Sequence, residues 1–229
     1  MKTIGLIGGM SWESTVTYYE IINTVIKERL GGLHSARCVL YSVDFQQIEN
    51  CQAAGDWQKS AEILANAARA LERAGADFLV ICTNTMHKVA PDIEKAVSLP
   101  LLHIADATAG RLLRKGVQTV ALLGTRYTME QDFYKKRLSD RGLRVLIPGE
   151  TERAEIHRII YDELCLGIRK DSSRQTLCAV LQGLKQAGAE GAILGCTELG
   201  LLVGTGDTDL LLFDTAKIHA EEAALVSLA

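Results

Sequence analysis

"LERAGADFLVICTNT" at residues 71–85 and "LKQAGAEGAILGCTE" at residues 184–198 are two versions of one pattern. In both, a helical pattern ends at Ala-Gly-Ala and an acidic residue, an apolar strand follows, and the strand stops at small polar residues. The glycines are 188 − 75 = 113 residues apart. "TIGLIG" from residue 3 matches "TVALLG" from residue 119 at an offset of 124 − 8 = 116 residues. Helix-glycine-strand junctions look alike in many α/β proteins, but two similar offsets favour an α/β unit that is used twice.

Short apolar segments alternate with longer amphipathic ones along the rest of the chain. Strands are predicted at residues 3–8, 37–44, 77–82, 99–104, 119–124, 143–148, 191–195 and 210–214. Helical patterns are clearest at residues 17–30, 60–75 and 174–188. Apolar strands that alternate with helices predict parallel sheets covered on both faces. We therefore expect an α/β fold of two pseudo-symmetric parallel-sheet units. Residues 1–98 plus 210–229 are expected to form the first, because the C-terminal helix returns to it, and residues 99–209 the second.

The composition of the 229 residues is that of an ordinary folded protein, 48% hydrophobic and 23% charged, with a net charge of −3. No basic run indicates a nucleic-acid surface, and no apolar run is long enough for a signal segment or a membrane span. The six cysteines are scattered without a Cys-x-x-Cys pair, which favours free thiols in a reducing cytoplasm over a zinc site. We expect a cytoplasmic protein that acts on a small molecule without a metal.

The polar residues that end the repeated strands are the candidate site. Ligands of open parallel sheets bind at the carboxyl ends of the strands, so two such units facing each other would form a cleft there. The 113-residue offset superimposes Thr83 on Cys196, Asn84 on Thr197 and Thr85 on Glu198. Thr83 and Cys196 would then approach one ligand from opposite faces. Opposed groups are what a stereoinversion needs, since one removes a proton and the other supplies one to the far side.

Five motifs, in order and across the whole chain, resemble the aspartate/glutamate racemase family, which are amino-acid racemases that need no pyridoxal phosphate. They are "GGMSWEST" (8–15), "CTNTMH" (82–87), "GTRYTM" (124–129), "GCTEL" (195–199) and "FDTAKIHAEEA" (213–223). Family members typically carry Cys-Asn-Thr in one motif and Gly-Cys-Thr-Glu in another, with the two cysteines as opposed acid and base. The resemblance implies a homodimeric racemase with Thr83 in the first cysteine's position and Cys196 in the second. Cys82 lies one residue early, and its side chain is expected to point away from the ligand.

The chemistry of α-proton removal assigns tasks to the residues at the strand ends. A Cys196 thiolate suits the base because surroundings can lower the pKa of a cysteine from about 8.5 to ~3.5–7.5, while a buried inert thiol is the alternative. Asn84, Thr85 and Thr197 are expected to hold the substrate carboxylate and stabilise the developing charge. Glu198 belongs either to the substrate site or to the cap of the following helix.

Residues after the first strand of each unit complete the predicted substrate site. Met10 is expected at the mouth of the cleft, and Thr125 and Thr128 lie in the corresponding stretch of the second unit. Carboxylate binding by these two threonines competes with turn formation and helix capping as their role. His87 and His219 also lie in the matching motifs, where a structural hydrogen bond is at least as good an explanation as proton transfer.

Two departures from the family pattern bear on the function. The Thr83 hydroxyl is far less acidic than a thiol, so it cannot act as a comparable ionised base near neutral pH. Aspartate-specific relatives carry basic residues where this chain has Gln52 and Cys165, both uncharged. The resemblance therefore implies a racemase of aspartate, glutamate or a broader range that includes homoserine-like amino acids.

Two other readings of the same residues stay open. One is an isomerase or decarboxylase of maleate or arylmalonate type that uses Cys196 alone. The other is a non-catalytic amino-acid-binding protein that has lost one catalytic cysteine. Because the sequence offers neither a pyridoxal-type lysine site nor a metal-ligand cluster, we expect any catalysis to proceed without cofactor.

Overall fold

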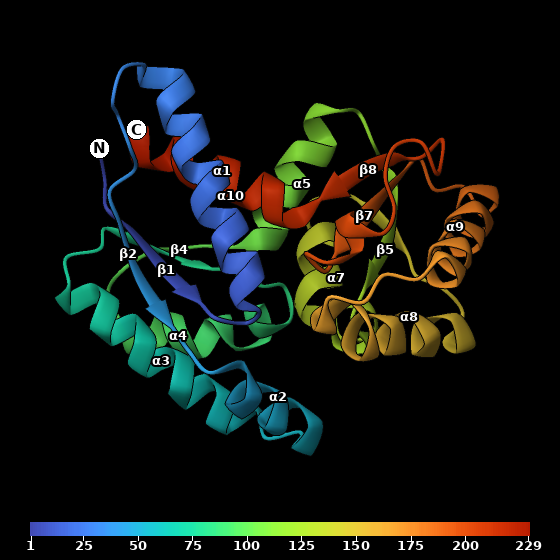
Figure 1. Cartoon of the computed structure of the whole chain (residues 1–229), viewed down its shortest axis with the longest axis horizontal. Helices are drawn as coiled ribbons and strands as arrows, with labels where there is room; N and C mark the ends of the chain where they lie inside the picture. Colours follow the sequence, from blue (N-terminus) through green and yellow to red (C-terminus); the bar gives the residue numbers. More distant parts are fainter. The chain divides into compact units, whose positions relative to one another are not determined.

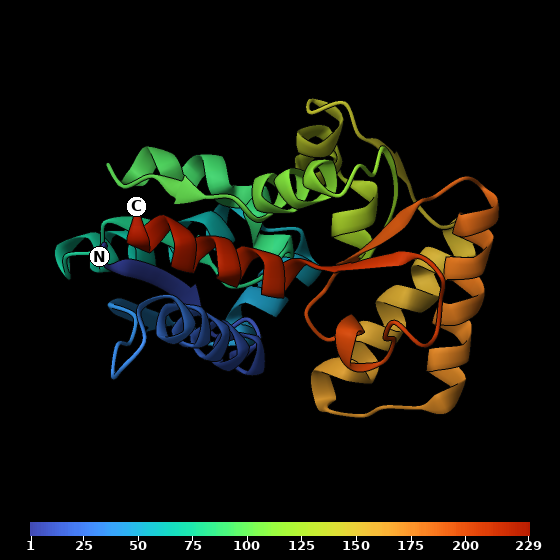
Figure 2. The same cartoon turned by 90° about the horizontal axis from the view of Figure 1, so that it is seen from above.

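The computed structural model describes residues 1–229 and divides into two compact units (Figures 1 and 2). Unit 1 comprises residues 1–104 and 216–229, and unit 2 comprises residues 105–215. Each unit holds one four-stranded sheet in which every strand pair is parallel. The predicted α/β fold class with two parallel-sheet units is confirmed.

The sheet of unit 1 has the strand order β2-β1-β3-β4. Its strands are β1 (Ile4–Gly8), β2 (Cys38–Ser42), β3 (Phe78–Ile81) and β4 (Leu101–Leu102). The two central strands, β1 and β3, are buried along their whole length, as apolar strands covered on both faces must be. Edge strand β2 is mostly exposed although its sequence is apolar.

Helices cover both faces of the unit 1 sheet. They are α1 (Trp12–Leu30), α2 (Phe45–Ala54), α3 (Trp57–Arg73), the short 3-10 helix η1 (Thr85–Val89), α4 (Ala90–Ala96) and α10 (Thr215–Leu228). Leu6 and Val80 pack with α1 and α10, whereas their neighbours Ile7 and Ile81 pack with α3 and α4. Figure 1 shows α1 and α10 on one side of this sheet and α3 on the other. The alternation of side chains along a strand thus gives unit 1 two apolar layers.

The sheet of unit 2 has the order β6-β5-β7-β8. Its strands are β5 (Thr119–Gly124), β6 (Arg144–Leu146), β7 (Gly191–Gly195) and β8 (Leu211–Asp214). Its helices are α5 (Ile104–Arg114), α6 (Arg126–Glu130), α7 (Asp132–Ser139), α8 (Glu150–Asp162), η2 (Leu164–Leu166), α9 (Asp171–Gln186) and η3 (Leu199–Leu201). Helices α8 and α9 bury an aliphatic face against Ala121 and Leu194 of the central strands.

The internal repeat predicted from the sequence is present in the strand orders. Strands β1 and β5, the first strands of the two units, are both second in their sheets, and β3 and β7 are both third. The sequence offsets of 113 and 116 residues connect these two pairs. Thr83 and Cys196 therefore occupy equivalent places, each after the third strand of its sheet.

The boundary between the units differs from the one expected. The strand expected at residues 99–104 of the second unit is β4, which pairs with β3 in unit 1 through Val80 and Leu102. The strand expected at residues 210–214 of the first unit is β8, which pairs with β7 in unit 2 through Ile193 and Phe213. An apolar run predicts a strand locally, but its choice of sheet depends on long-range pairing. Only the chain after β8 returns to unit 1, where the Lys2 N–H donates to the Ser227 carbonyl at 2.8 Å.

Candidate active site

The half-site of unit 1 is the bend that follows β3. Cys82 is fully buried and packs with Tyr18 and Ile22 of α1, so its thiol points into the core. Burial raises the pKa of the Cys82 thiol. Thr83 follows it and is only half-buried. The structure thus separates the two candidates for the first position as predicted, with Cys82 in the core and Thr83 at the carboxyl edge of the sheet.

Hydrogen bonds fix the backbone of this bend on both sides of Thr83. The Ser14 hydroxyl, in the first turn of α1, donates to the Cys82 carbonyl at 3.0 Å. His87 approaches from η1, and its Nδ1 lies 2.8 Å from the Thr83 carbonyl oxygen. The His87 N–H donates to the Asn84 carbonyl at 3.0 Å. Asn84 and Thr85 are both buried.

Gln52 and Met10 are connected to η1, the short helix that follows the bend, through Met86. The Gln52 side-chain amide donates to the Met86 sulfur at 3.0 Å, just past Thr85. Met10 belongs to the apolar cluster that holds Met86 and Ile48, and it is buried. Of the five residues predicted for this half, Thr83, Asn84 and Thr85 follow β3 directly, Gln52 contacts Met86 of η1, and Met10 lies in the apolar cluster that includes Met86.

The half-site of unit 2 begins where β7 ends. The Cys196 thiol donates to Glu198 Oε2 at 2.9 Å, and the Thr197 hydroxyl donates to the same oxygen at 2.5 Å. Glu198 is buried, and its side chain makes no capping bond to the following helix η3. The sequence left two roles open for Glu198, and the structure does not show the helix cap.

The surroundings of Cys196 in unit 2 favour the protonated thiol. Burial is the largest cause that raises its pKa well above 9.0, followed by the negative Glu198 and the nearby Cys165 thiol. The expectation of a lowered pKa is therefore not met by the residues of unit 2 themselves. A cation brought into the site would act in the opposite direction.

Thr125 and Thr128 lie beside Cys196 at the same edge of the sheet. Gly124 at the end of β5 pairs with Gly195, and a Cβ on Gly195 would meet the Leu123 carbonyl oxygen at 2.7 Å. This close approach brings the threonines next to the end of β7. Thr125 caps α6 by accepting from the Thr128 N–H at 3.3 Å, and their hydroxyls are 3.2 Å apart. Helix capping, one of the two roles expected for Thr125, is thus present.

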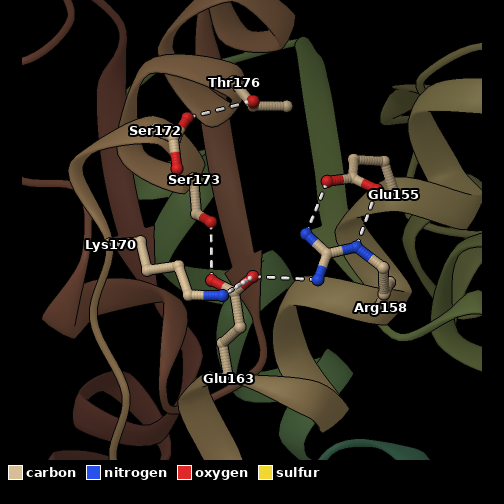
Figure 3. A network of polar contacts seen from close by, with 7 residues as sticks. All are labelled: Glu155, Arg158, Glu163, Lys170, Ser172, Ser173 and Thr176. Carbon is tan, nitrogen blue, oxygen red and sulfur yellow. Dashed lines mark hydrogen bonds and ion pairs between the residues drawn. The ribbon is translucent and has the colours of Figure 1, made fainter.

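A buried carboxylate anchors the turn that carries Cys165. Glu163 is 2% exposed and accepts from the Ser173 hydroxyl at 2.6 Å, from Arg158 at 2.9 Å and from Lys170 at 3.2 Å (Figure 3). The Ser173 hydrogen bond is the largest cause that lowers the pKa of Glu163 to about 2. Cys165 packs on the same core cluster as Cys196. The network therefore fixes a neutral side chain close to the Cys196 thiol.

One group near the first half-site had no signal in the sequence. His103 is buried, and its ring centroid lies 4.5 Å from that of His87, which also stacks edge-on with His219 at 5.6 Å. The three imidazoles come from β4–α5, η1 and α10, and no local pattern connects such distant positions.

Neither half-site contains a metal-ligand set, and no group of three His, Cys, Asp or Glu side chains elsewhere could hold a metal ion. All six cysteines are free thiols. No helix combines the length and the apolar character that crossing a membrane requires.

The model of the Asp/Glu/Hydantoin racemase family matches residues 7–223 of this chain. The chain belongs to this family. A crystal structure from Yersinia pestis, provisionally named an Asp/Glu racemase, is 55% identical, covers 100% of both chains and superimposes with a TM-score of 0.94. An aspartate racemase homologue from Pyrococcus horikoshii OT3 is 38% identical over 100% of both chains, with a TM-score of 0.86.

A relative that is named for its broad substrate specificity is also similar to this chain. The broad specificity amino-acid racemase of Bacillus subtilis (strain 168) is 24% identical over 99% of this chain and 98% of its own length. Racemases are isomerases, so the predicted family and enzyme class are confirmed.

Proposed function

We propose that the chain is a cofactor-independent amino-acid racemase in which Cys196 and Thr83 act on opposite faces of the α-carbon. The observation that carries the proposal is the equivalence of the two half-sites, because each residue follows the third strand of an equivalent sheet. Family membership supplies the reaction class. The Cys196–Glu198 hydrogen bond supplies a group that can take the thiol proton.

In the proposed reaction, Glu198 accepts the Cys196 proton and leaves a thiolate. The thiolate removes the α-proton of an L-amino acid, and the electron pair of the broken C–H bond moves into the substrate carboxylate. The Thr83 hydroxyl, or a water that it holds, then gives a proton to the other face and recovers one from solvent. Glu198 returns its proton to solvent, so the enzyme ends in its starting protonation state and the substrate is inverted.

We propose that the substrate itself provides a cation to the site. Its α-ammonium group near Cys196 would stabilise the thiolate and oppose the effect of Glu198 on the pKa. Its carboxylate requires donors, for which we propose Asn84 and Thr85 in unit 1. In unit 2 the donors would be the hydroxyls of Thr125, Thr128 and Thr197.

The residues proposed to contact the substrate side chain are neutral. Gln52 is held by Met86, and Cys165 is held on the turn anchored by Glu163. A neutral pocket does not select strongly for a second carboxylate. We therefore propose a range that includes aspartate, glutamate and homoserine-like amino acids. The broad specificity of the Bacillus subtilis relative is in line with this range.

A panel of L- and D-amino acids in deuterated water tests the proposal. NMR measures α-hydrogen exchange, chiral chromatography measures inversion, and Cys196→Ala is the inactive control. Exchange and inversion of at least one amino acid, both absent in Cys196→Ala, is the expected result. Turnover of maleate or arylmalonates with no amino acid exchanged would contradict racemisation, and binding without exchange would make the chain an amino-acid-binding protein. Light scattering tests the proposed homodimer.

A further inference from the structure

The bend that carries Thr83 is held by a buried histidine whose tautomer can be deduced. The Ile104 N–H donates to His87 Nε2 at 3.2 Å, so this nitrogen is the acceptor of the ring. The ring proton therefore lies on Nδ1. His87 Nδ1–H in turn donates to the Thr83 carbonyl at 2.8 Å. His87 thus connects the bend after β3 to the last residue of unit 1 before the chain enters unit 2.

A second histidine fixes the other end of the same segment. His219 lies on α10, and its Nε2 is 2.8 Å from the Leu102 carbonyl oxygen. Because a carbonyl oxygen can only accept a hydrogen bond, Nε2 carries the ring proton. Its Nδ1 then accepts from the Tyr18 hydroxyl at 2.8 Å. The segment from Leu102 to Ile104 is consequently held at its first residue by His219 and at its last by His87.

Both rings are suited to stay neutral in this arrangement. Burial is the main cause that holds the pKa of His87 well below 6.5, with further contributions from His103 and His219. Burial also lowers the pKa of His219 to about 4. A neutral imidazole has one donor and one acceptor. This matches the carbonyl and the N–H that His87 meets, and the carbonyl and the Tyr18 hydroxyl that His219 meets. A protonated His87 would instead present an N–H to the Ile104 N–H.

We propose that His87 is the positioning residue of Thr83, fixing the bend so that the hydroxyl can deliver a proton to the α-carbon. This role rests on the proposed function. His87 does not touch the substrate in this proposal and acts only through the Thr83 backbone. Displacing a reacting group by about 1 Å can cost on the order of 10²-fold in rate. The proton transfer on the Cys196 face uses Cys196 and Glu198 of unit 2, so it depends on His87 only through the proposed carboxylate donors Asn84 and Thr85.

Two isosteric variants separate the two hydrogen bonds of His87. Asn carries a side-chain N–H at the position of Nδ1, so His87→Asn keeps the bond to the Thr83 carbonyl and loses the one from Ile104. Gln places its amide oxygen near the position of Nε2, so His87→Gln keeps the bond from Ile104 and loses the one to Thr83. Tyr18→Phe is the control, because it removes the hydrogen bond to His219 in the same buried cluster and leaves both hydrogen bonds of His87 in place.

The readout is the ratio of inversion to α-hydrogen exchange of an L-amino acid in deuterated water, measured for each variant that keeps the wild-type circular dichroism. We expect His87→Gln to lose inversion by about 10-fold or more while exchange falls by less than about 3-fold. His87→Asn and Tyr18→Phe are expected to keep the wild-type ratio. A merely structural role would lower exchange and inversion together and leave the ratio unchanged, and this result would overturn the proposal.

The tautomer gives a test that does not depend on variant folding. In the ¹⁵N imidazole spectrum of the wild-type chain, His87 is expected to carry its proton on Nδ1, and a proton on Nε2 would overturn the proposal. If the wild type neither exchanges nor inverts any amino acid, the proposed function fails and the role of His87 fails with it. If the wild type is active and His87→Gln has the same ratio of inversion to exchange, the positioning role of His87 fails and the proposed function stands.

Discussion

The Cys196 thiol and the Glu198 carboxylate form a 2.9 Å hydrogen bond directly after β7. Since Glu198 is buried and also accepts from Thr197, its charge acts on the thiol with little screening by water. The same carboxylate that stabilises the resting thiol is the proposed acceptor of its proton. If this account is correct, replacing Glu198 should make the Cys196 thiol react faster with an alkylating agent and should make racemisation slower.

Glu198→Gln removes the negative charge that raises the pKa of Cys196 while keeping the size of the side chain. The pKa of the thiol should fall, and alkylation of Cys196 by iodoacetamide at about pH 8 should become several-fold faster. Racemisation should nevertheless fall by about 10²-fold, because the amide cannot take the thiol proton. Peptide mass spectrometry distinguishes Cys196 from the other five cysteines. An unchanged alkylation rate would show that Glu198 does not control the thiol.

Cys196→Ala and Cys82→Ala should behave differently even though the two residues follow equivalent strands. Cys196→Ala should abolish both exchange and inversion. Cys82 packs in the core of unit 1, so Cys82→Ala should keep much of the activity and cost about 1 kcal/mol of stability. Activity assays together with urea unfolding check both. An active Cys196→Ala variant would end the proposed mechanism.

The buried imidazole of His219 predicts a loss of stability in acid. The unfolded chain protonates this ring near 6.5, whereas the folded chain resists protonation down to a pKa of about 4. The unfolded state therefore binds more protons, and stability falls as the pH drops through this window, by up to ~3 kcal/mol. His219→Gln, which keeps a donor for the Leu102 carbonyl, should reduce the change in unfolding free energy between about pH 7 and about pH 4, while His87 still contributes to it.

The control for this measurement is His34→Gln, which removes an exposed imidazole and should keep the acid-induced loss. A wild-type stability that does not change across the window would contradict the depressed pKa of His219.

Glu163 should matter far more for stability than its neighbour Glu155. Glu163→Gln removes the charge from a buried carboxylate with three donors and should cost about 2 kcal/mol. Glu155 is paired with Arg158 on the surface, so Glu155→Gln should cost less than about 0.5 kcal/mol. Urea unfolding of the two variants checks the difference. Equal losses would show that the network in Figure 3 does not anchor the turn of Cys165.

Strands and strand ends could be read from the sequence because their signals are local. The predicted strands at residues 119–124 and 191–195 coincide with β5 and β7, since each is a buried apolar run bounded by polar residues. Thr83 and Cys196 were placed at strand ends for the same reason. The helix over Glu150–Asp162 was not predicted, because its charged residues obscure the apolar face of Ile156 and Ile160.

Features that depend on long-range contacts could not be read in the same way. β4 and β8 were assigned to the wrong sheets because two or three apolar residues do not specify a partner strand. The contact of His87 with His103 and His219 likewise needs the folded chain. The raised pKa of Cys196 follows from burial and from the direction of the Glu198 side chain, neither of which a sequence motif contains.

The most direct test of the proposal that Thr83 and Cys196 act on opposite faces is to compare the rates of proton transfer on the two faces. We predict that these rates are unequal. In the proposed mechanism, Cys196 would face the L-enantiomer, and its thiol would exchange with solvent and return a proton to the same face. Delivery from the Thr83 side should be slower, although kcat/KM must be equal in both directions because enantiomers have equal free energy. Thr83→Cys should bring the two exchange-to-inversion ratios closer together.

The measurement is the ratio of α-deuterium incorporation to inversion in wild-type enzyme, started separately from each enantiomer in deuterated water. L-substrate should gain deuterium faster than D-product appears, whereas D-substrate should invert before it exchanges. Equal ratios from the two enantiomers would show that Thr83 is not the weaker partner of Cys196 and would contradict the account.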